Sequence, residues 1–181
     1  LLEQNVWIDS EKLKDNDNLK KALKHGVLNI GFSGLAECLK ALTGEHQGES
    51  KEAQKFGIKI VEFMRKKCDE YSEKYNLNFN LVATPKEEIS NKFIKMDQAI
   101  YGKLKGITDK NRYTNSFHIP EGYRISTEDK IKIEAQYHSL TNGGHIAIVQ
   151  IKNGDTKDVI NVIKTMKENG IGYGKIVNME K

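Results

Sequence analysis

Residues 77–88 read Leu77-Asn78-Phe79-Asn80-Leu81-Val82-Ala83-Thr84-Pro85-Lys86-Glu87-Glu88, and this stretch decides the fold. Its first half has the apolar character of a buried strand, and its second half has the chemistry of a helix start. Thr84 can cap the first free amides, Pro85 suits the first helical position, and Glu87 follows Thr84 by three residues as in a capping box. The stretch therefore predicts a strand that turns directly into a helix.

The same turn has a second interpretation. A helix that begins after a strand is a common place for an α/β protein to hold a phosphate, because the free amides and the helix dipole point at the anion. Glu87 and Glu88 occupy the positive end that a phosphate would use, and this favours a plain helix start. Local chemistry leaves both interpretations open.

The residues before this turn predict another strand and two helices. Residues 27–32 have strand character, Ser33-Gly34 is a tight turn, and apolar residues then recur at helical spacing until Gly44. Residues 52–75 carry an apolar stripe of about six turns, with Ser50 as its cap. A short helix around Leu19–Leu23 is also expected.

Two cysteines, Cys38 and Cys68, fall on the two main helices of this region. We expect both to pack in the core, since buried thiols behave as small hydrophobes. Neither belongs to a Cys-x-x-Cys pair, so we expect no zinc site and no redox dithiol within this segment.

The residues after the turn continue the alternation of helices and strands. A helix is predicted from Pro85 to about Asp97, and residues 107–118 form a long polar loop, a length typical of functional or disordered segments. Residues 130–135 alternate like a half-buried strand, and residues 145–151 form another strand after the turn at 141–144. A last helix starts at Asp155 or Thr156, and its expected inward residues are Val159, Ile160, Ile163 and Met166. This order predicts an α/β fold with a largely parallel sheet.

Length and charge limit the classes of function. The 181 residues suit one domain or one lobe of a larger protein. The chain begins without Met, and its Gly170–Gly174 run resembles the entrance to another strand, so we expect a piece of a longer polypeptide. Lys and Arg outnumber Asp and Glu by 29 to 25, but both signs are interspersed, and we expect no nucleic-acid partner. No apolar run spans a membrane, and we expect a cytoplasmic protein.

Three turns are candidates for a ligand site, since ligands of α/β sheets bind beyond the carboxyl ends of the strands. They are Ser33-Gly34, Thr84-Pro85 and the end of the long loop. The loop carries hydroxyl, amide and imidazole groups suited to a phosphate or a sugar hydroxyl, on Thr114, Asn115, Ser116 and His118. Alternatively, these side chains only satisfy backbone amides of the loop. The histidines are scattered, so neither a metal site nor a catalytic residue is assigned.

Several motifs, spread over nearly the whole chain, are specific enough in their order and spacing to compare with known families. They are Asn29-Ile30-Gly31-Phe32-Ser33-Gly34-Leu35-Ala36-Glu37-Cys38-Leu39, Gly44-Glu45-His46, Ala83-Thr84-Pro85-x-Glu87, Ile107-Thr108-Asp109-Lys110, Tyr113-Thr114-Asn115-Ser116-Phe117-His118 and Gly170-Ile171-Gly172-Tyr173-Gly174. Together they resemble one family, the anaerobic class III ribonucleoside-triphosphate reductases, and the most specific piece is the Tyr113–His118 stretch.

The resemblance implies a segment, residues 1–181, of the ten-stranded α/β barrel of glycyl radical enzymes and ribonucleotide reductases. Such enzymes reduce ribonucleoside triphosphates to deoxyribonucleotides, commonly with formate as the reductant. A partner activase, an iron-sulfur enzyme that uses S-adenosylmethionine, generates the radical, and the complete enzyme is expected to be a homodimer. The substrate-side residues that the resemblance implies are Thr84, Pro85, Lys86, Glu87, Ser90, Tyr113, Thr114, Asn115, Ser116 and His118.

The sequence also departs from the family pattern. The family's thiyl-radical cysteine lies upstream of the matched region, and its zinc cysteines and radical glycine lie downstream, so neither the radical site nor the zinc site is expected here. The isolated segment is therefore predicted to be inactive. The alternative is a noncatalytic module, derived from the same barrel, that binds phosphate or a partner.

Overall fold

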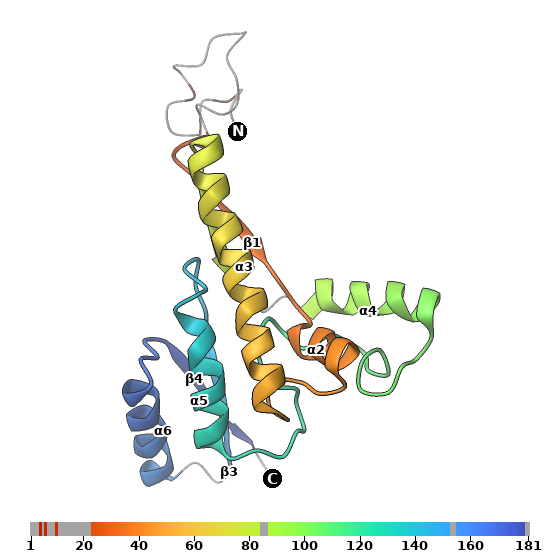
Figure 1. Cartoon of the computed structure of the whole chain (residues 1–181). Helices are drawn as coiled ribbons and strands as arrows, with labels where there is room; N and C mark the ends of the chain where they lie inside the picture. The colour runs from red at the N-terminus through yellow and green to blue at the C-terminus, as the bar shows by residue number, and fades with distance from the viewer. Residues whose placement is uncertain are drawn as a thin grey trace.

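The computed structural model describes residues 23–83, 87–152 and 155–179, together with residues 4, 6 and 10. The long helix α3 packs against β2 and α5. In Figure 1, α4 projects away from the other helices. The elements in chain order are β1 (Val27–Gly31), α2 (Leu35–Thr43), α3 (Lys51–Tyr75), β2 (Asn78–Val82), α4 (Glu87–Tyr101), α5 (Thr127–His138), β3 (Ala147–Lys152), α6 (Thr156–Glu168) and β4 (Gly174–Met179). None of the helices in these ranges combines the length and apolarity that a bilayer crossing needs.

The four strands form two parallel pairs. β1 pairs with β2, from Val27 opposite Asn78 to Gly31 opposite Val82, and β3 pairs with β4. One parallel bridge, between Val82 and Gly144, connects the two pairs. Helices separate the successive strands of each pair, and parallel strands require such crossovers. The predicted α/β class is confirmed.

The edge of β2 that faces away from β1 is bonded to a side chain of α3 and to the turn at residues 141–144. Gly143 donates its N–H to the Leu81 carbonyl at 2.8 Å, and a Cβ at Gly143 would lie 3.0 Å from that oxygen, so glycine permits the close approach. Three backbone N–H groups of this edge donate outward: Phe79 to Ser72 Oγ (2.9 Å), Leu81 to Asn142 Oδ1 (3.0 Å) and Ala83 to the Gly144 carbonyl (3.0 Å).

Two apolar cores meet at α5. Helix α5 contributes Tyr137 to the first core and Ile131 to the second, and it therefore joins them. The first core consists of Leu35, Leu39, Val61, Cys68, Leu81, Ala83, Phe117 and Tyr137. The second core consists of Ile131, Ala147, Val149, Ile151, Val162, Met166 and Ile171.

The prediction of a strand at residues 130–135 is wrong, because these residues lie inside α5. Ser126 caps this helix: its Oγ accepts the Asp129 N–H at 3.0 Å and donates to the Asp129 carboxylate at 2.7 Å. The apolar-polar alternation covers only a few residues. The buried side chains of the longer segment follow a helical period, and they are Ile131, Glu134, Tyr137 and His138.

Two side-chain predictions are also wrong. Ile160 and Ile163 of α6 were expected to face inward, but they are 44% and 54% exposed, and the buried residues of α6 are Val162 and Met166. Cys38 was expected in the core but is exposed, because Leu35, Ala36 and Leu39 already form the buried face of α2. Cys68 is buried as predicted. Most of the helix expected at residues 19–23 lies outside the described residues.

Candidate functional site

Three segments that are distant in sequence meet at the carboxyl end of β1. Ser33 Oγ lies 2.7 Å from Ser90 Oγ in α4, and it donates to the Thr114 carbonyl at 3.1 Å. Gly34 N–H donates to the same carbonyl at 2.7 Å, and Ser33 forms an antiparallel bridge with Asn115. The structure therefore brings together the Ser33-Gly34 turn, the first turn of α4 and the long polar loop.

Only part of the predicted turn before α4 can be placed. Thr84, Pro85 and Lys86 lie outside the described residues, whereas Glu87 and Ser90 are described. The Glu87 carboxylate forms an ion pair with Arg112 of the loop at 2.8 Å. This pair compensates one of the two negative charges at the helix start, which lessens the electrostatic argument against an anion there.

A buried carboxylate that the sequence analysis missed holds the first part of the loop. Glu37, in the first turn of α2, is 2% exposed and accepts from the Thr114 hydroxyl at 2.6 Å and from the Thr114 N–H at 3.2 Å. It also forms an ion pair with Lys110 at 2.5 Å. Since Thr114 gives its hydroxyl proton to Glu37, only the oxygen lone pairs of that hydroxyl are left for a ligand. Thr114 therefore holds the loop in place.

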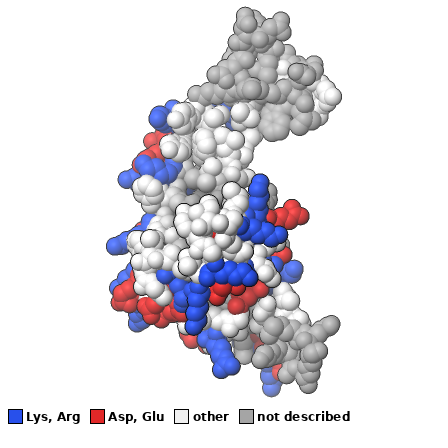
Figure 2. All heavy atoms as spheres, turned by 90° about the vertical axis from the view of Figure 1, so that its right-hand side faces the viewer, with Lys and Arg blue, Asp and Glu red and all other residues white. Residues whose placement is uncertain are grey.

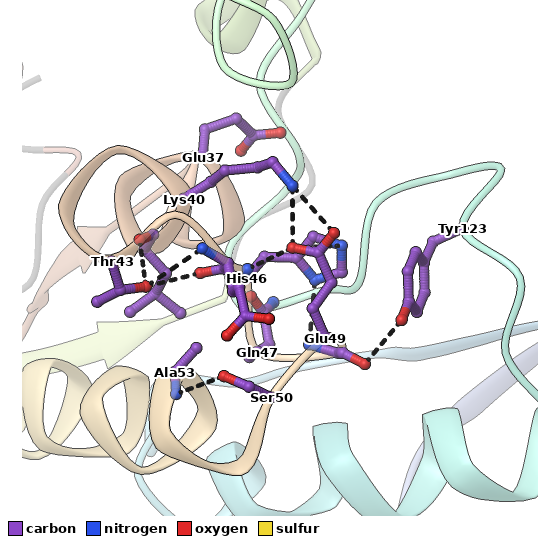
Figure 3. A network of polar contacts seen from close by, with 12 residues as sticks. Glu37, Lys40, Thr43, His46, Gln47, Glu49, Ser50, Ala53 and Tyr123 are labelled. Carbon is purple, nitrogen blue, oxygen red and sulfur yellow. Dashed lines mark hydrogen bonds and ion pairs between the residues drawn. The ribbon is translucent and has the colours of Figure 1, made fainter.

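The second part of the loop rests on the turn at residues 44–50, shown in Figure 3. Gln47 is 1% exposed and donates to the carbonyls of Phe117 and His118 at 2.8 and 2.9 Å. Around it, Lys40 binds Glu49 at 2.9 Å, Glu49 accepts the His46 N–H at 2.8 Å, and the Tyr123 hydroxyl donates to the Gly48 carbonyl at 3.1 Å (Figure 3). The predicted Gly44-Glu45-His46 motif thus belongs to the support of the loop.

The remaining loop residues differ in whether their polar side-chain atoms already have hydrogen-bond partners. The Tyr113 hydroxyl donates to Asp97 at 2.6 Å, and burial together with this carboxylate raises the pKa of Tyr113. In contrast, Asn115 Oδ1 and Ser116 Oγ are buried and have no hydrogen-bond partner among the described residues. Buried polar atoms without partners are rare in folded proteins and call for an explanation. Asn115 and Ser116 are therefore the loop residues whose side chains still need a polar partner.

A groove of about 1660 Å³ extends from this cluster toward α6 and β3. Its volume exceeds the roughly 300–1,000 Å³ of ordinary small-molecule sites. Its lining includes Asn91, Tyr113, Thr114, Asn115 and His118. Four Lys and Arg side chains line it, and three of them form ion pairs with carboxylates: Lys110 with Glu37, Arg112 with Glu87 and Glu121, and Lys130 with Glu134.

The described ranges hold no metal cluster, and the face of the molecule shown in Figure 2 carries charges of both signs. No group of three or more His, Cys, Asp or Glu side chains there is arranged to hold a metal ion. On the face shown in Figure 2, Lys and Arg are interspersed with Asp and Glu. The chemistry of the site is therefore that of hydroxyl, amide and imidazole groups beside paired charges.

This arrangement of strands and helices is the fold of anaerobic ribonucleotide reductases. A solved anaerobic ribonucleotide reductase superposes with a TM-score of 0.73 at 18% identity, over 86% of this chain and 25% of that chain. The Thermotoga maritima enzyme, with dATP bound in its specificity site, gives 0.70 at 18% identity, over 85% and 26%. At this level of identity the likeness establishes the fold alone.

Sequence comparison then defines the family. The family described as anaerobic ribonucleoside-triphosphate reductase matches residues 1–179. The reductase of Salmonella typhimurium is 36% identical over 145 residues, 78% of this chain and 20% of the relative, and that of phage T4 is 33% identical over 142 residues, 77% and 22%. The chain belongs to the anaerobic ribonucleoside-triphosphate reductase family, as its motifs predicted. It spans about a fifth of the length of these curated relatives.

Proposed function

We propose that the chain is a segment of the ten-stranded catalytic α/β barrel of an anaerobic ribonucleoside-triphosphate reductase. The complete enzyme reduces ribonucleoside triphosphates to deoxyribonucleoside triphosphates by glycyl and thiyl radical chemistry. Two features support this proposal: family membership, and the bridge from Val82 to Gly144, which links two parallel pairs into the order β1, β2, β3, β4. Such an order of parallel strands with intervening helices fits an arc of a barrel wall.

Within that enzyme, the segment supplies contacts to the substrate. The observation that carries this assignment is the pair of buried, unpartnered atoms Asn115 Oδ1 and Ser116 Oγ, in a loop that lies against the first turn of α4. A nucleotide offers sugar hydroxyls and phosphates that can complete such hydrogen bonds. The contacting residues are Asn115, Ser116, Ser90 and His118, with residues 84–86 at the phosphates.

The radical machinery belongs to other parts of the enzyme. The chain has two cysteines, Cys38 and Cys68, and neither belongs to a Cys-x-x-Cys pair. In line with the family pattern, we infer that the zinc cysteines, the radical glycine and the thiyl cysteine come from outside this segment, as does the contact with the activase that uses S-adenosylmethionine. Formate as the reductant, a homodimer and a cytoplasmic location complete the proposal.

The test is CTP binding by the complete reductase that carries Asn115→Ala. We expect the dissociation constant to rise about tenfold or more, which corresponds to the loss of one or two hydrogen bonds. Lys164→Ala, at an exposed position of helix α6 outside the groove lining, is the control and should bind CTP as the parent does. Unchanged affinity in a folded Asn115→Ala variant would contradict the substrate contact.

A second measurement tests the parent protein itself. Mass spectrometry of the native gene product should give a chain several times longer than 181 residues. The isolated segment should form no deoxyribonucleotide with the activase and S-adenosylmethionine. A native product of this length would instead indicate a noncatalytic phosphate-binding module.

A further inference from the structure

A second buried carboxylate, Glu134 of α5, lies beneath the end of the loop. It is 2% exposed, and its oxygens receive three groups: the Ile119 N–H at 2.9 Å, His118 Nδ1 at 3.1 Å and Lys130 Nζ at 2.7 Å. Lys130 also donates to the Ile148 carbonyl of β3 at 2.8 Å. The Glu134 carboxylate therefore ties together the loop, α5 and, through Lys130, β3.

These contacts keep Glu134 ionised. Burial acts to raise the pKa of the Glu134 carboxyl, but the hydrogen bond from His118 and the hydrogen bond and charge of Lys130 outweigh it and hold the pKa below its usual range. An ionised carboxylate only accepts hydrogen bonds, so His118 Nδ1 must carry the proton of their shared bond. In the neutral ring, Nε2 is then an acceptor.

The second nitrogen of His118 remains available. Nε2 has no hydrogen-bond partner among the described residues, while the His118 side chain is 13% exposed and lines the groove. Since Nδ1 is turned toward the buried carboxylate and the ring lines the groove, we infer that the ring edge with Nε2 faces the groove. The His118 N–H donates to the Asn115 carbonyl at 3.0 Å, so the ring and the proposed nucleotide contact belong to one local unit.

We propose that His118 accepts a hydrogen bond at Nε2 from a sugar hydroxyl of the bound nucleotide, and that Glu134 is the positioning residue that fixes this nitrogen. The assignment rests on the proposed nucleotide site and adds to it the group that is recognised. A hydroxyl is a donor, and it matches a neutral imidazole acceptor, whereas a phosphate offers no proton to Nε2. A buried acceptor that binds Nδ1–H fixes the tautomer of the neutral ring, so that Nε2 is the acceptor.

The experiment compares His118→Asn with His118→Gln in the complete reductase. The Asn amide remains near the place of Nδ1 and can still reach Glu134, but it cannot replace Nε2, whereas the Gln amide can extend toward Nε2. We expect His118→Asn to weaken CTP binding about tenfold at an unchanged melting temperature, and His118→Gln to recover part of that loss. Inhibition of CTP binding by inorganic tripolyphosphate, which has no hydroxyl, should be the same in parent and variants.

Glu134→Gln tests the positioning role. The Gln amide can donate to Nδ1 and so move the ring proton to Nε2, and we expect a loss of CTP affinity similar to that of His118→Asn. Glu168→Gln, at an exposed site of α6, should have no effect. CTP affinity unchanged in His118→Asn, or an equal loss for CTP and tripolyphosphate, would overturn the sugar contact. Failure of the parent reductase to bind CTP would instead overturn the proposed function, and this contact with it.

Discussion

Glu37, Gln47 and Glu134 hold one loop from three elements, and each of these side chains is almost fully buried. A buried carboxylate is stable only while its partners remain, since an unpaired donor or acceptor loses its hydration without compensation. The conformation of the loop therefore depends on side chains outside the proposed nucleotide contact. Substitution of these supports should lower stability and affinity together.

Glu37→Ala tests this dependence. The change leaves Lys110 without its carboxylate and removes the acceptor of the Thr114 hydroxyl, so we expect a loss of about 1–3 kcal/mol in the free energy of unfolding. Chemical denaturation at neutral pH measures it. Glu62→Ala, at an exposed position of α3, should stay within about 0.5 kcal/mol of the parent. Equal stabilities of the two variants would show that Glu37 does not support the loop.

His138 makes stability depend on pH. Burial, and then the neighbouring His145, lower the pKa of His138 to about 4. The folded protein therefore resists protonation here, whereas the unfolded chain takes up a proton near pH 6.5. The free energy of unfolding should fall as the pH drops from about 6.5 to 4, and His138 should account for on the order of 3 kcal/mol of this fall. Above pH 7 His138 is neutral in both states and adds no pH dependence.

Urea denaturation between pH 7.5 and 4.5 measures this effect when the parent is compared with His138→Phe, which keeps a flat ring beside Phe117. The variant should lose less stability on acidification, because it lacks the His138 imidazole. Its other titrating groups are those of the parent. Parallel curves would mean that His138 is protonated in the folded state as easily as in the unfolded one.

Sequence reasoning singled out the loop residues that we propose as ligand contacts more readily than the side chains that support the loop. Asn115, Ser116 and His118 stand out because they are polar residues clustered in a loop without periodicity. Glu37 and Glu134 lie inside helices, where glutamate is ordinarily a solvent-facing residue. Only the positions of Glu37 between Ala36 and Leu39, and of Glu134 on the Ile131 face, could have signalled their burial.

At the scale of the elements, α3 packs closely against α2 and α5 at Gly57. A Cβ at Gly57 would lie 2.7 Å from the Tyr137 hydroxyl and 3.0 Å from Leu39 Cδ1. Gly→Ala inside a helix usually stabilises by about 0.5–1 kcal/mol. Here we expect Gly57→Ala to destabilise by about 1–3 kcal/mol, because the core must shift to accept the methyl group.

Thermal or urea unfolding of Gly57→Ala measures the sign of this change. Lys55→Ala, at an exposed position of the same helix, is the control and should be close to neutral. A more stable Gly57→Ala variant would mean that α3 and α5 have room to separate.

Helices and strands were predictable where a single hydrophobic period dominates the segment. The apolar stripe of α3 and the strand-to-helix turn at residues 77–88 were visible in the sequence, and the structure confirms α3, β2 and α4. Helix α5 was not, because its face toward the two cores includes the polar Glu134 and His138. A pattern of apolar residues alone cannot show a helix whose buried face is partly polar.

At the scale of the whole molecule, much apolar surface is exposed. Helix α4 carries four exposed residues at spacings of four, three and four: Ile89 (43%), Phe93 (49%), Met96 (53%) and Ile100 (69%). An exposed apolar stripe of this kind marks a surface that packs against another element or another chain. We expect the isolated 181-residue chain to self-associate through this stripe at micromolar concentration.

Sedimentation velocity of the chain carrying Met96→Lys and Ile100→Lys tests this expectation. The two charges should shift the chain toward the monomer. The same number of lysines on the polar face of α3, as Glu62→Lys and Glu73→Lys, should not. Equal association of both double variants would place the contact elsewhere.

The hydrogen bonds on the outer edge of β2 limit how the sheet can grow. An open strand edge can recruit a strand from any neighbouring molecule, and that is a route to aggregation. At β2 this route is closed: the amides of Phe79, Leu81 and Ala83 are already donated to Ser72, Asn142 and Gly144. A foreign strand cannot add at that side without first displacing the turn. On this side of β2 the sheet therefore continues only within the chain itself, through the bridge from Val82 to Gly144 that leads toward β3.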